Sequence, residues 1–306
     1  MSSHWTASSI PDQRGRRVII TGANSGIGYE TALALASCGA KVILACRSRS
    51  KAEEAQSRIF AAVPGASVEF RPLDLMSLAS IRAFAEGFRT DCTRLDLLCN
   101  NAGIMMVPRQ RTEDGFEAQI GTNHLGHFAL TGLLLDRLLA TEGSRVVNVS
   151  SLAHRRARIK FDDLNSRRSY SPMGAYGQSK LANLLFTVEL ERRLRATAAT
   201  TLAAASHPGW TATNLQSNVR LFAALNPFFG QRCPMGALPT LYAATSPHVA
   251  GAGYYGPGGF GELRGLPKRV RMTRAAHDPG AAAQLWDVSE QLTGVRFDLP
   301  APRPEP

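Results

Sequence analysis

Residues 17–28, Arg-Val-Ile-Ile-Thr-Gly-Ala-Asn-Ser-Gly-Ile-Gly, decide the fold expected for this chain. A β-branched run ends at Thr21 and leads directly into a loop with glycines at positions 22, 26 and 28. Residues 29–38 then show a helical pattern, which Gly39 stops. Glycines in this arrangement permit a tight turn and let backbone amides approach a pyrophosphate at the positive end of the helix. The stretch therefore predicts a strand, a phosphate-binding loop and a helix in direct succession.

The next predicted strand, residues 41–46, ends at Arg47, which lies about 20 residues after Gly28. An acidic residue at this place binds the ribose hydroxyls of NAD, whereas an arginine accommodates the 2′-phosphate of NADP. Arg49 and Lys51 lie nearby, and no carboxylate stands at the end of the strand. The sequence therefore favours NADP, although a surface arginine cluster is the alternative interpretation.

Further strand-like and helix-like segments alternate along the rest of the chain without a linker, which predicts one domain. The expected fold is α/β, a doubly wound (Rossmann) parallel sheet of about seven strands. Its later strands are expected at residues 68–70, 95–98, 145–149 and 200–205, and its later helices at 50–63, 78–88, 115–139, 176–195, 235–244 and 280–292. The helix at 50 is expected to begin with a capping box, Ser50 to Glu53. Residues 1–14 are interpreted as an N-terminal extension, 15–296 as the domain, and 297–306 as a Pro-rich tail.

Composition excludes several classes of protein. The 306 residues are 44% hydrophobic and 19% charged, which is ordinary for a soluble protein. We find no signal-peptide pattern and no transmembrane segment, so a cytoplasmic protein is expected. The five cysteines show no Cys-x-x-Cys spacing, and His124 and His127 lack a carboxylate in ligand spacing, so no metal site is expected. The net charge of +11 gathers at residues 155–168 and 264–274, but without interleaved aromatics these patches indicate a solvated surface and no nucleic-acid partner.

Tyr176-Gly177-Gln178-Ser179-Lys180 carries the expected chemistry. On a helix, residues four apart share one face, so the phenol and the ammonium lie together. To exchange a proton near neutrality, the pKa of a tyrosine must fall by roughly 3 units from about 10. A cation about 4 Å away can supply much of that shift, because it is worth about 4 kcal/mol at an effective dielectric of 20. The pair alone is a common coincidence, and its interpretation depends on the accompanying motifs.

Together these motifs resemble the short-chain dehydrogenase/reductase family over roughly residues 15 to 295. The resemblance is carried by Thr21-Gly22-x-x-x-Gly26-Ile27-Gly28, Asn100-Asn101-Ala102-Gly103, Asn123, Ser151, Tyr176-x-x-x-Lys180 and Pro208-Gly209. Within the family, the segments at residues 45–47, 148–154 and 176–180 are similar to the branch that contains retinol dehydrogenases, the WW-domain-containing oxidoreductase and protochlorophyllide reductase. Substrates in this branch are diverse, so the resemblance names none.

The resemblance implies four catalytic residues. Tyr176 would be the general acid/base, Ser151 would bind the substrate oxygen, Lys180 would lower the pKa of the tyrosine and hold the ribose, and Asn123 would fix a water beside Lys180. Asp74 would meet the adenine, and Thr211 or Thr213 the nicotinamide amide. The implied cofactor contacts are Gly22, Asn24, Ser25, Gly26, Ile27, Gly28, Arg47, Asp74, Leu75, Asn101, Ala102, Gly103, Tyr176, Lys180, Pro208, Gly209, Thr211 and Thr213.

The implied function is NADP(H)-dependent hydride transfer to or from a carbonyl or alcohol carbon. The gap between Ser151 and Tyr176 is longer than in most of the family, and the insert at 155–172 is expected to reshape the mouth of the pocket. Residues 215–234, rich in Phe and Leu, predict a substrate lid and hence a small apolar substrate, or else a buried connector. An NADP-binding sensor without turnover and a C=C reductase remain alternatives. By family analogy the protein would form a homodimer or homotetramer.

Overall fold

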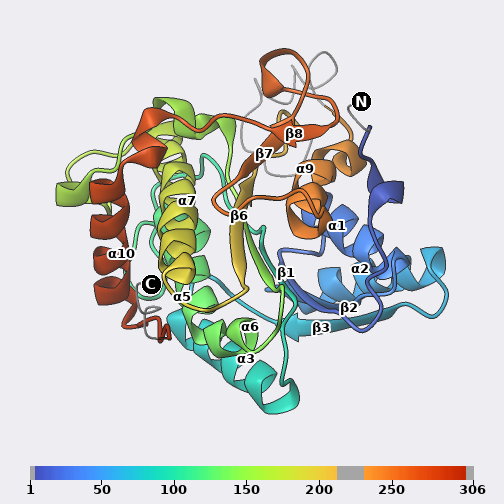
Figure 1. The fold of residues 1–306 in the computed structure, drawn as a ribbon. Coiled ribbons are helices and arrows are strands. Elements are labelled where there is room, and N and C mark those ends of the chain that lie inside the picture. Colours follow the sequence, from blue (N-terminus) through green and yellow to red (C-terminus); the bar gives the residue numbers. More distant parts are fainter. Residues whose placement is uncertain (1–3, 212–230, 301–306) are drawn as a thin grey trace.

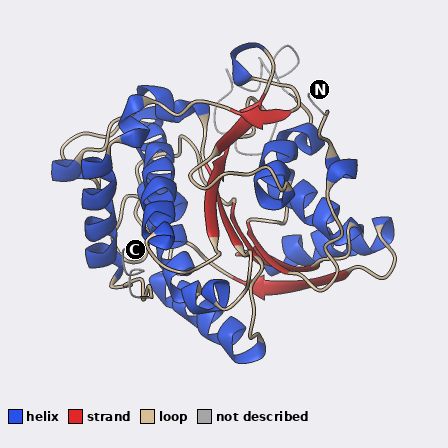
Figure 2. Ribbon diagram, in the orientation of Figure 1, coloured by secondary structure: helices blue, strands red, loops and turns tan. Residues whose placement is uncertain are grey.

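The computed structural model describes residues 4–211 and 231–300. They form a sheet of eight strands in the order β3-β2-β1-β4-β5-β6-β7-β8, with helices on both of its faces (Figures 1 and 2). The strands are β1 (Arg17–Thr21), β2 (Lys41–Cys46), β3 (Ser67–Pro72), β4 (Leu97–Asn100), β5 (Arg145–Val149), β6 (Leu202–Ser206), β7 (Tyr254–Pro257) and β8 (Pro267–Arg269). The first seven pair in parallel, and β8 pairs antiparallel with β7. The predicted doubly wound fold is confirmed.

Successive side chains along each strand point to opposite faces of the sheet, and the apolar ones form a hydrophobic core on each face. Val18 and Ile20 of β1 pack on one face of the sheet, while Ile19 packs on the other. The first face is covered by α1 (Gly26–Ser37), α2 (Arg49–Ala62) and α9 (Cys233–Thr245). The opposite face is covered by α3 (Leu78–Asp91), α5 (Gly126–Leu133), α6 (Leu135–Leu139), α7 (Pro172–Arg195) and α10 (Pro279–Thr293).

The order of the strands positions the site. The chain runs from β1 outward through β2 to β3 and then returns to place β4 on the other side of β1. In doubly wound sheets, ligands bind beyond the carboxyl ends of the strands at the point where the strand order reverses. Here that point lies between β1 and β4, next to the glycine loop that follows β1.

Several expected elements differ in detail. The helix expected at 115–139 is divided into α4 (Ala118–Ile120), a π-helical turn (Gly121–Leu125), α5 and α6. The helix expected at Ser50 begins one residue earlier, because Ser48 accepts a hydrogen bond from the backbone of Lys51 and serves as the N-cap. Strand β7 lies in the glycine-rich region where no strand was predicted, and β8 was missed because its Pro-Lys-Arg sequence is typical of protected edge strands.

The ends of the described chain pack on the domain. Trp5, in the N-terminal extension, lies edge-on to Tyr242 of α9 with ring centroids 5.2 Å apart. Phe297 packs against Trp286 of α10 with ring centroids 4.4 Å apart. No helix in the described part of the chain has the length and apolar character needed to cross a bilayer. The five cysteines are free thiols.

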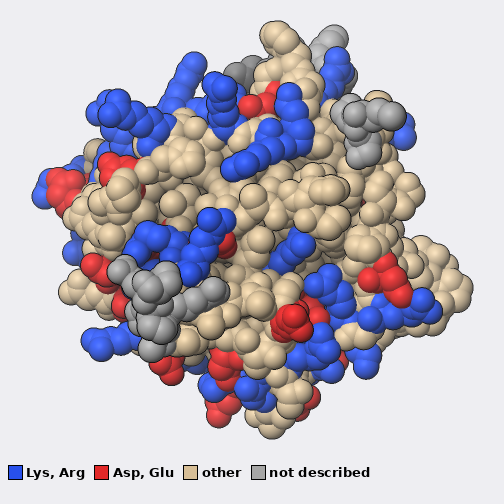
Figure 3. Space-filling model, in the orientation of Figure 1, with Lys and Arg blue, Asp and Glu red and all other residues tan. Residues whose placement is uncertain are grey.

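The predicted basic patches lie at the surface. Lys and Arg side chains are prominent along the upper rim of the molecule, near β7 and β8 (Figure 3). At this rim, Arg155 pairs with Glu262 at 2.8 Å, joining the short helical segment after β5 to the loop between β7 and β8. The patch at 155–168 therefore borders the carboxyl end of β5, where the site lies.

Candidate active site

The glycine loop between β1 and α1 is shaped to receive an anionic group. Gly22 and Gly26 adopt φ of 65° and 55°, in the left-handed region that side chains disfavour. A Cβ atom on Gly28 would lie 2.5 Å from the carbonyl oxygen of Gly22, so only glycine lets the helix approach the strand this closely. The N-cap of α1, Ser25, makes no side-chain hydrogen bond to the helix. The first turn of α1 thus keeps backbone donors for an anion, and the cradle fits a pyrophosphate.

The loop after β4 is fastened to the end of β1 by one threonine. Thr21 Oγ1 accepts hydrogen bonds from the backbone N–H groups of Asn101 and Ala102, both at 2.9 Å. Asn101 Nδ2 donates to the Thr21 carbonyl at 2.8 Å. These bonds close the floor of the site between β1 and β4.

The carboxyl ends of β2 and β3 bring Arg47 and Asp74 together. Arg47 Nη1 lies 3.9 Å from Asp74 Oδ2, and 69% of the Arg47 side chain is exposed. An ion pair this long and this exposed contributes little to stability. The guanidinium therefore remains available to an anionic ligand.

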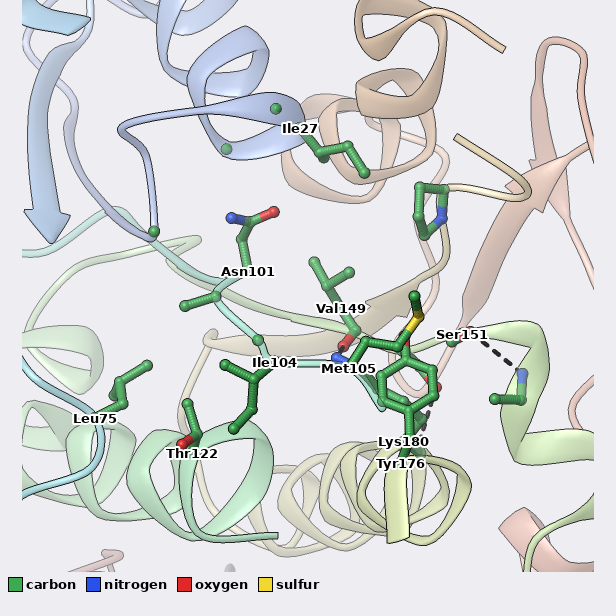
Figure 4. A pocket seen from close by; sticks show the side chains of 18 of the residues that line it. Ile27, Leu75, Asn101, Ile104, Met105, Thr122, Val149, Ser151, Tyr176 and Lys180 are labelled. Atoms are coloured by element: carbon green, nitrogen blue, oxygen red, sulfur yellow. Dashed lines mark hydrogen bonds between the residues drawn. The ribbon is translucent and has the colours of Figure 1, made fainter. Parts of the chain in front are cut away.

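Tyr176 and Lys180 lie on one face of α7, as their spacing predicts, and both point into the cavity (Figure 4). The helix begins with Ser171 as N-cap and Pro172 in its first turn, which is a strong start signal. Lys180 Nζ donates to the carbonyl of Val149, the last residue of β5, at 3.1 Å (Figure 4). This bond fixes the ammonium at the carboxyl end of the sheet.

The hydroxyls of the two serines after β5 make different contacts. Ser150 Oγ donates to the backbone carbonyl of Lys180 at 2.8 Å, so its hydroxyl is used in joining β5 to α7. Both serines line the cavity, but only hydrogen bonding with Ser151 lowers the pKa of the Tyr176 phenol. Ser151 Oγ also accepts the backbone N–H of Ala153 at 3.2 Å, which orients the serine (Figure 4).

Burial controls the ionisation of the pair. It raises the pKa of Tyr176, and the hydrogen bond with Ser151 lowers that pKa by a smaller amount. Burial also lowers the pKa of Lys180 to about 8. The sequence analysis expected Lys180 to lower the pKa of the tyrosine; in this structure Lys180 Nζ lies 5.8 Å from the centre of the Tyr176 ring, and desolvation of the phenol dominates. A cationic ring bound beside the phenol would act in the opposite direction to this desolvation.

Asn123 lies behind the cavity, on the π-helical turn. Its Oδ1 accepts the backbone N–H of Ile104 at 2.8 Å, and its Nδ2 donates to the Ile104 carbonyl and to Ser179 Oγ, both at 2.9 Å. The side chain therefore clamps the loop after β4 to the helix that carries Tyr176. Its expected role in holding a water beside Lys180 stays a prediction.

The segment after β6 forms the opposite wall. Gly209 adopts φ of 66°, and a Cβ atom there would lie 2.4 Å from the carbonyl of Leu263. Thr211 Oγ1 donates to the Pro208 carbonyl at 2.7 Å, and Pro208 and Thr211 line the cavity. The other threonine considered for the nicotinamide amide, Thr213, and most of the expected lid at 215–234 lie outside the described residues.

A single cavity of about 820 Å³ unites these parts. It contains the four predicted groups of the site: the glycine loop, the Arg47 and Asp74 pair, the loop after β4, and the Ser151 and Tyr176 region. The predicted residues that line it are Gly22, Asn24, Ser25, Gly26, Ile27, Gly28, Arg47, Asp74, Leu75, Asn101, Ala102, Gly103, Ser151, Tyr176, Lys180, Pro208, Gly209 and Thr211. One end can hold a dinucleotide, and the other places a phenol and a hydroxyl beside the remaining space.

Comparison with known proteins establishes the family. The family model described as short chain dehydrogenase matches residues 16–223. The chain is a short-chain dehydrogenase. It is similar to retinol dehydrogenase 12 from Homo sapiens, with 46% identity over 284 residues that cover 93% of this chain and 88% of that protein. The predicted resemblance to retinol dehydrogenases is confirmed, and the protein belongs to a family of oxidoreductases that use nicotinamide cofactors.

Solved structures of other short-chain dehydrogenases share the fold. An uncharacterized protein from Mycobacterium paratuberculosis is 48% identical, with a TM-score of 0.83 over 97% of this chain and 100% of that chain. A short-chain dehydrogenase from Shigella flexneri, complexed with NADP, is 23% identical, with a TM-score of 0.64 over 78% of this chain and 94% of that chain. The sheet and its flanking helices are thus those of the family.

The cavity of this short-chain dehydrogenase also contains residues that the sequence analysis did not single out. They follow the ends of β4 and β5 or precede Tyr176 on α7: Ile104, Met105, Val107, Leu152, Ala153, Arg155, Arg156 and Met173. The rule that ligands lie beyond the carboxyl ends of parallel strands would have indicated most of them. Met173 lies three residues before Tyr176, on the same helical face.

Proposed function

We propose that the protein transfers a hydride between NADP(H) and the carbonyl or alcohol carbon of an apolar substrate, with Tyr176 as general acid/base. The observation that carries this proposal is the arrangement around Tyr176. Its buried phenol shares a helix face with Lys180 and lines the same cavity as Ser151 and the glycine loop. A phenol, a hydroxyl donor and a nucleotide cradle in one cavity suit hydride transfer coupled to proton transfer.

In carbonyl reduction, bound NADPH supplies the hydride. Tyr176 donates its proton to the substrate oxygen as the carbon accepts the hydride, and the product is an alcohol. Ser151 donates a hydrogen bond to the same oxygen and orients it beside the phenol. Lys180 would hold the nicotinamide ribose of the bound cofactor, and its ammonium would favour the tyrosinate that remains. Alcohol oxidation uses the same residues in the reverse order, with Tyr176 accepting the proton.

Activity can be tested directly with purified protein. We expect loss of reduced nicotinamide absorbance when NADPH is mixed with apolar aldehydes, ketones, quinones or retinoids, since retinol dehydrogenase 12 is a relative. Product analysis distinguishes an alcohol from a product reduced at a C=C bond. Cofactor binding without turnover of any of these compounds, or of the matching alcohols with NADP⁺, would instead support the sensor interpretation.

The choice of serine gives a first expected result. Ser151→Ala should lower kcat by about 10²-fold, as loss of one donor to a reacting oxygen does in other enzymes. Ser150→Ala is the matched control, because Ser150 donates to the Lys180 carbonyl and its loss should cost about 1 kcal/mol of stability with a smaller change in kcat. Steady-state kinetics of the two variants decide the matter. A larger loss of kcat in Ser150→Ala would show that the wrong serine was assigned.

Selection of NADP is proposed to rest on Arg47. Strand β2 ends without a carboxylate, and the Arg47 guanidinium is exposed beside the cavity with only a weak pairing to Asp74. The related structure from Shigella flexneri is an NADP complex, which agrees with this choice. A charge-assisted contact to the 2′-phosphate is worth roughly 1.5–3 kcal/mol, or about 10- to 150-fold in affinity.

Arg47→Asp is therefore expected to abolish or reverse a strong preference for NADPH, and Arg47→Lys to keep part of it, because an ammonium lacks the planar fork. Titration of NADPH and NADH against each variant measures the ratio. Arg49→Asp is the matched control, since its side chain is equally exposed, at 69%, but pairs with Glu53 on α2. Equal affinities in the wild type, or an unchanged ratio in Arg47→Asp, would place cofactor selection elsewhere.

A further inference from the structure

The loop that follows β4 forms one wall of the cavity and contains a backbone conformation that needs support. Met106 adopts φ of 51°, in the left-handed region that residues with a side chain disfavour. Its neighbours Met105 and Val107 line the cavity, as Tyr176 does. Figure 4 shows Met105 beside Tyr176. A strained residue persists only where surrounding contacts hold it, and such residues cluster at ligand sites. The contacts that hold Met106 therefore control the shape of this wall.

Gln119, on α4, supplies the first of these contacts. Its Oε1 accepts the backbone N–H of Met106 at 2.8 Å, and its Nε2 donates to the carbonyl of Pro172 at 3.0 Å and to the hydroxyl of Tyr170 at 3.1 Å. The side chain is completely buried. Because Pro172 begins α7, one amide ties the strained loop to the helix that carries Tyr176.

Tyr170 supplies the second contact. Its hydroxyl donates to the carbonyl of Val107 at 2.7 Å while it accepts from Gln119. Tyr170 lies in the insert at 155–172, which the sequence analysis expected to reshape the pocket mouth. The insert thus acts on the cavity through the loop at 104–107. Together Gln119 and Tyr170 hold the backbone on both sides of the peptide bond between Met106 and Val107.

We propose that Gln119 and Tyr170 are positioning residues that set substrate specificity by holding Met105 as an apolar wall beside Tyr176. The substrate class that fits this wall is an elongated apolar carbonyl compound or alcohol. Met105 lies on the loop side of the cavity and Met173 on the α7 side, and methionine offers an unbranched, adaptable apolar surface. This inference rests on the proposed function, because it concerns the substrate end of the same site.

Two variants test the proposal, with decanal and propanal as probes and NADPH as cofactor. Tyr170→Phe keeps the ring and removes the hydroxyl, and Gln119→Ala removes the amide. Each should raise KM for decanal by about 3- to 10-fold, the effect of losing one or two hydrogen bonds. The kcat and the Kd of NADPH should stay within about twofold, and the KM of propanal should change less than that of decanal, because a short aldehyde buries less apolar surface against the wall.

Gln56→Ala is the matched control. Its Nε2 also donates to a backbone carbonyl, that of Val68, at 2.6 Å, but it lies on α2 away from the cavity. A general loss of stability would affect this variant and the test variants alike and would leave the ratio of the two KM values unchanged. An unchanged ratio in both Tyr170→Phe and Gln119→Ala would overturn the proposal.

A rescue variant tests whether the raised KM for decanal results from a change in the Met106 conformation. Glycine adopts a φ of 51° without strain, so Met106→Gly added to Tyr170→Phe should bring the KM for decanal back toward the wild-type value. We call the hydrogen bonds from Gln119 and Tyr170 to this loop the clamp. A KM that stays raised in the double variant would show that the clamp does not act through the Met106 conformation.

Hydrogen exchange separates this proposal from the proposed function. The Met106 N–H should exchange faster with solvent in Gln119→Ala than in the wild type, and Gln56→Ala should leave its rate unchanged. An unchanged exchange rate of the Met106 N–H in Gln119→Ala would overturn the proposed clamp, even if the enzyme is active. Absence of turnover of both aldehydes by the wild type would overturn the proposed function, while exchange would still decide whether the clamp exists.

Discussion

Replacing Tyr176 with Phe is expected to lower kcat by at least about 10²-fold while leaving cofactor affinity nearly unchanged. The substitution keeps the aromatic ring that packs at the start of α7 and removes only the hydroxyl that faces Ser151. Ser151 retains its bond to the N–H of Ala153, so the loop after β5 should keep its position. The expected loss is therefore one of chemistry, because the transferable proton is gone.

Steady-state kinetics and fluorescence titration of NADPH measure the two quantities separately. Tyr242→Phe serves as the control, because Tyr242 packs on Trp5 at the opposite face of the sheet and does not line the cavity. If Tyr176→Phe retained more than about a tenth of the wild-type kcat, the assignment of Tyr176 as general acid/base would be wrong.

Replacing Lys180 with Met should abolish most activity and weaken cofactor binding, yet raise the free energy of unfolding at pH 7. Burial lowers the pKa of Lys180 to about 8, from about 10.4 in an unfolded chain. At pH 7 the folded protein therefore holds a buried ammonium at a cost of up to about 3 kcal/mol. Methionine fills similar space without the charge. The Val149 carbonyl keeps a donor in the variant, since Asn183 Nδ2 binds it at 3.0 Å.

The pH dependence of this gain has a definite sign. Below about pH 8 Lys180 is protonated in both states, and the full penalty is present. Between about pH 8 and 10.4 the folded state has lost the proton and the unfolded state still binds it, so the penalty declines as pH rises. The stability advantage of Lys180→Met should accordingly shrink from pH 7 to pH ~9.5.

Urea unfolding of both proteins at the two pH values measures the advantage. Lys51→Met is the control, because Lys51 is exposed at the start of α2. An advantage of Lys180→Met that is equal at the two pH values, or a loss of stability at pH 7, would contradict the expected cost of the buried ammonium. Such a trade between stability and function is common at active sites.

Several parts of the site were predictable because they depend on local geometry. The glycine loop needs residues that tolerate positive φ within a few positions of a strand, and Gly22 and Gly26 have this conformation. Tyr176 and Lys180 share a face because any α-helix places residues four apart on one side. Arg47 could be assigned to the edge of the cavity because the strand that precedes it ends there in every doubly wound sheet.

Other parts depend on contacts between residues that are distant in the chain. Gln119 lies 13 residues from Met106 and 53 residues from Pro172, and only the packed fold brings the three together. No spacing rule indicates that Met106 adopts positive φ, because methionine has no preference for it. The interruption of the helix at 115–139 and the antiparallel pairing of β8 with β7 were likewise decided by neighbours in space.

The sequence by itself determined the family, the fold and the identity of the chemical groups at this site. Only the tertiary structure decided their electrostatic state, because burial depends on everything that packs around a residue. The phenol of Tyr176 and the ammonium of Lys180 are both shifted toward their neutral forms by desolvation, which no spacing of residues along the chain expresses. The shape of the substrate wall was also decided by the tertiary structure. Hydrogen bonds with Gln119 and Tyr170 hold the loop at Met106 in a backbone conformation that its own sequence does not favour.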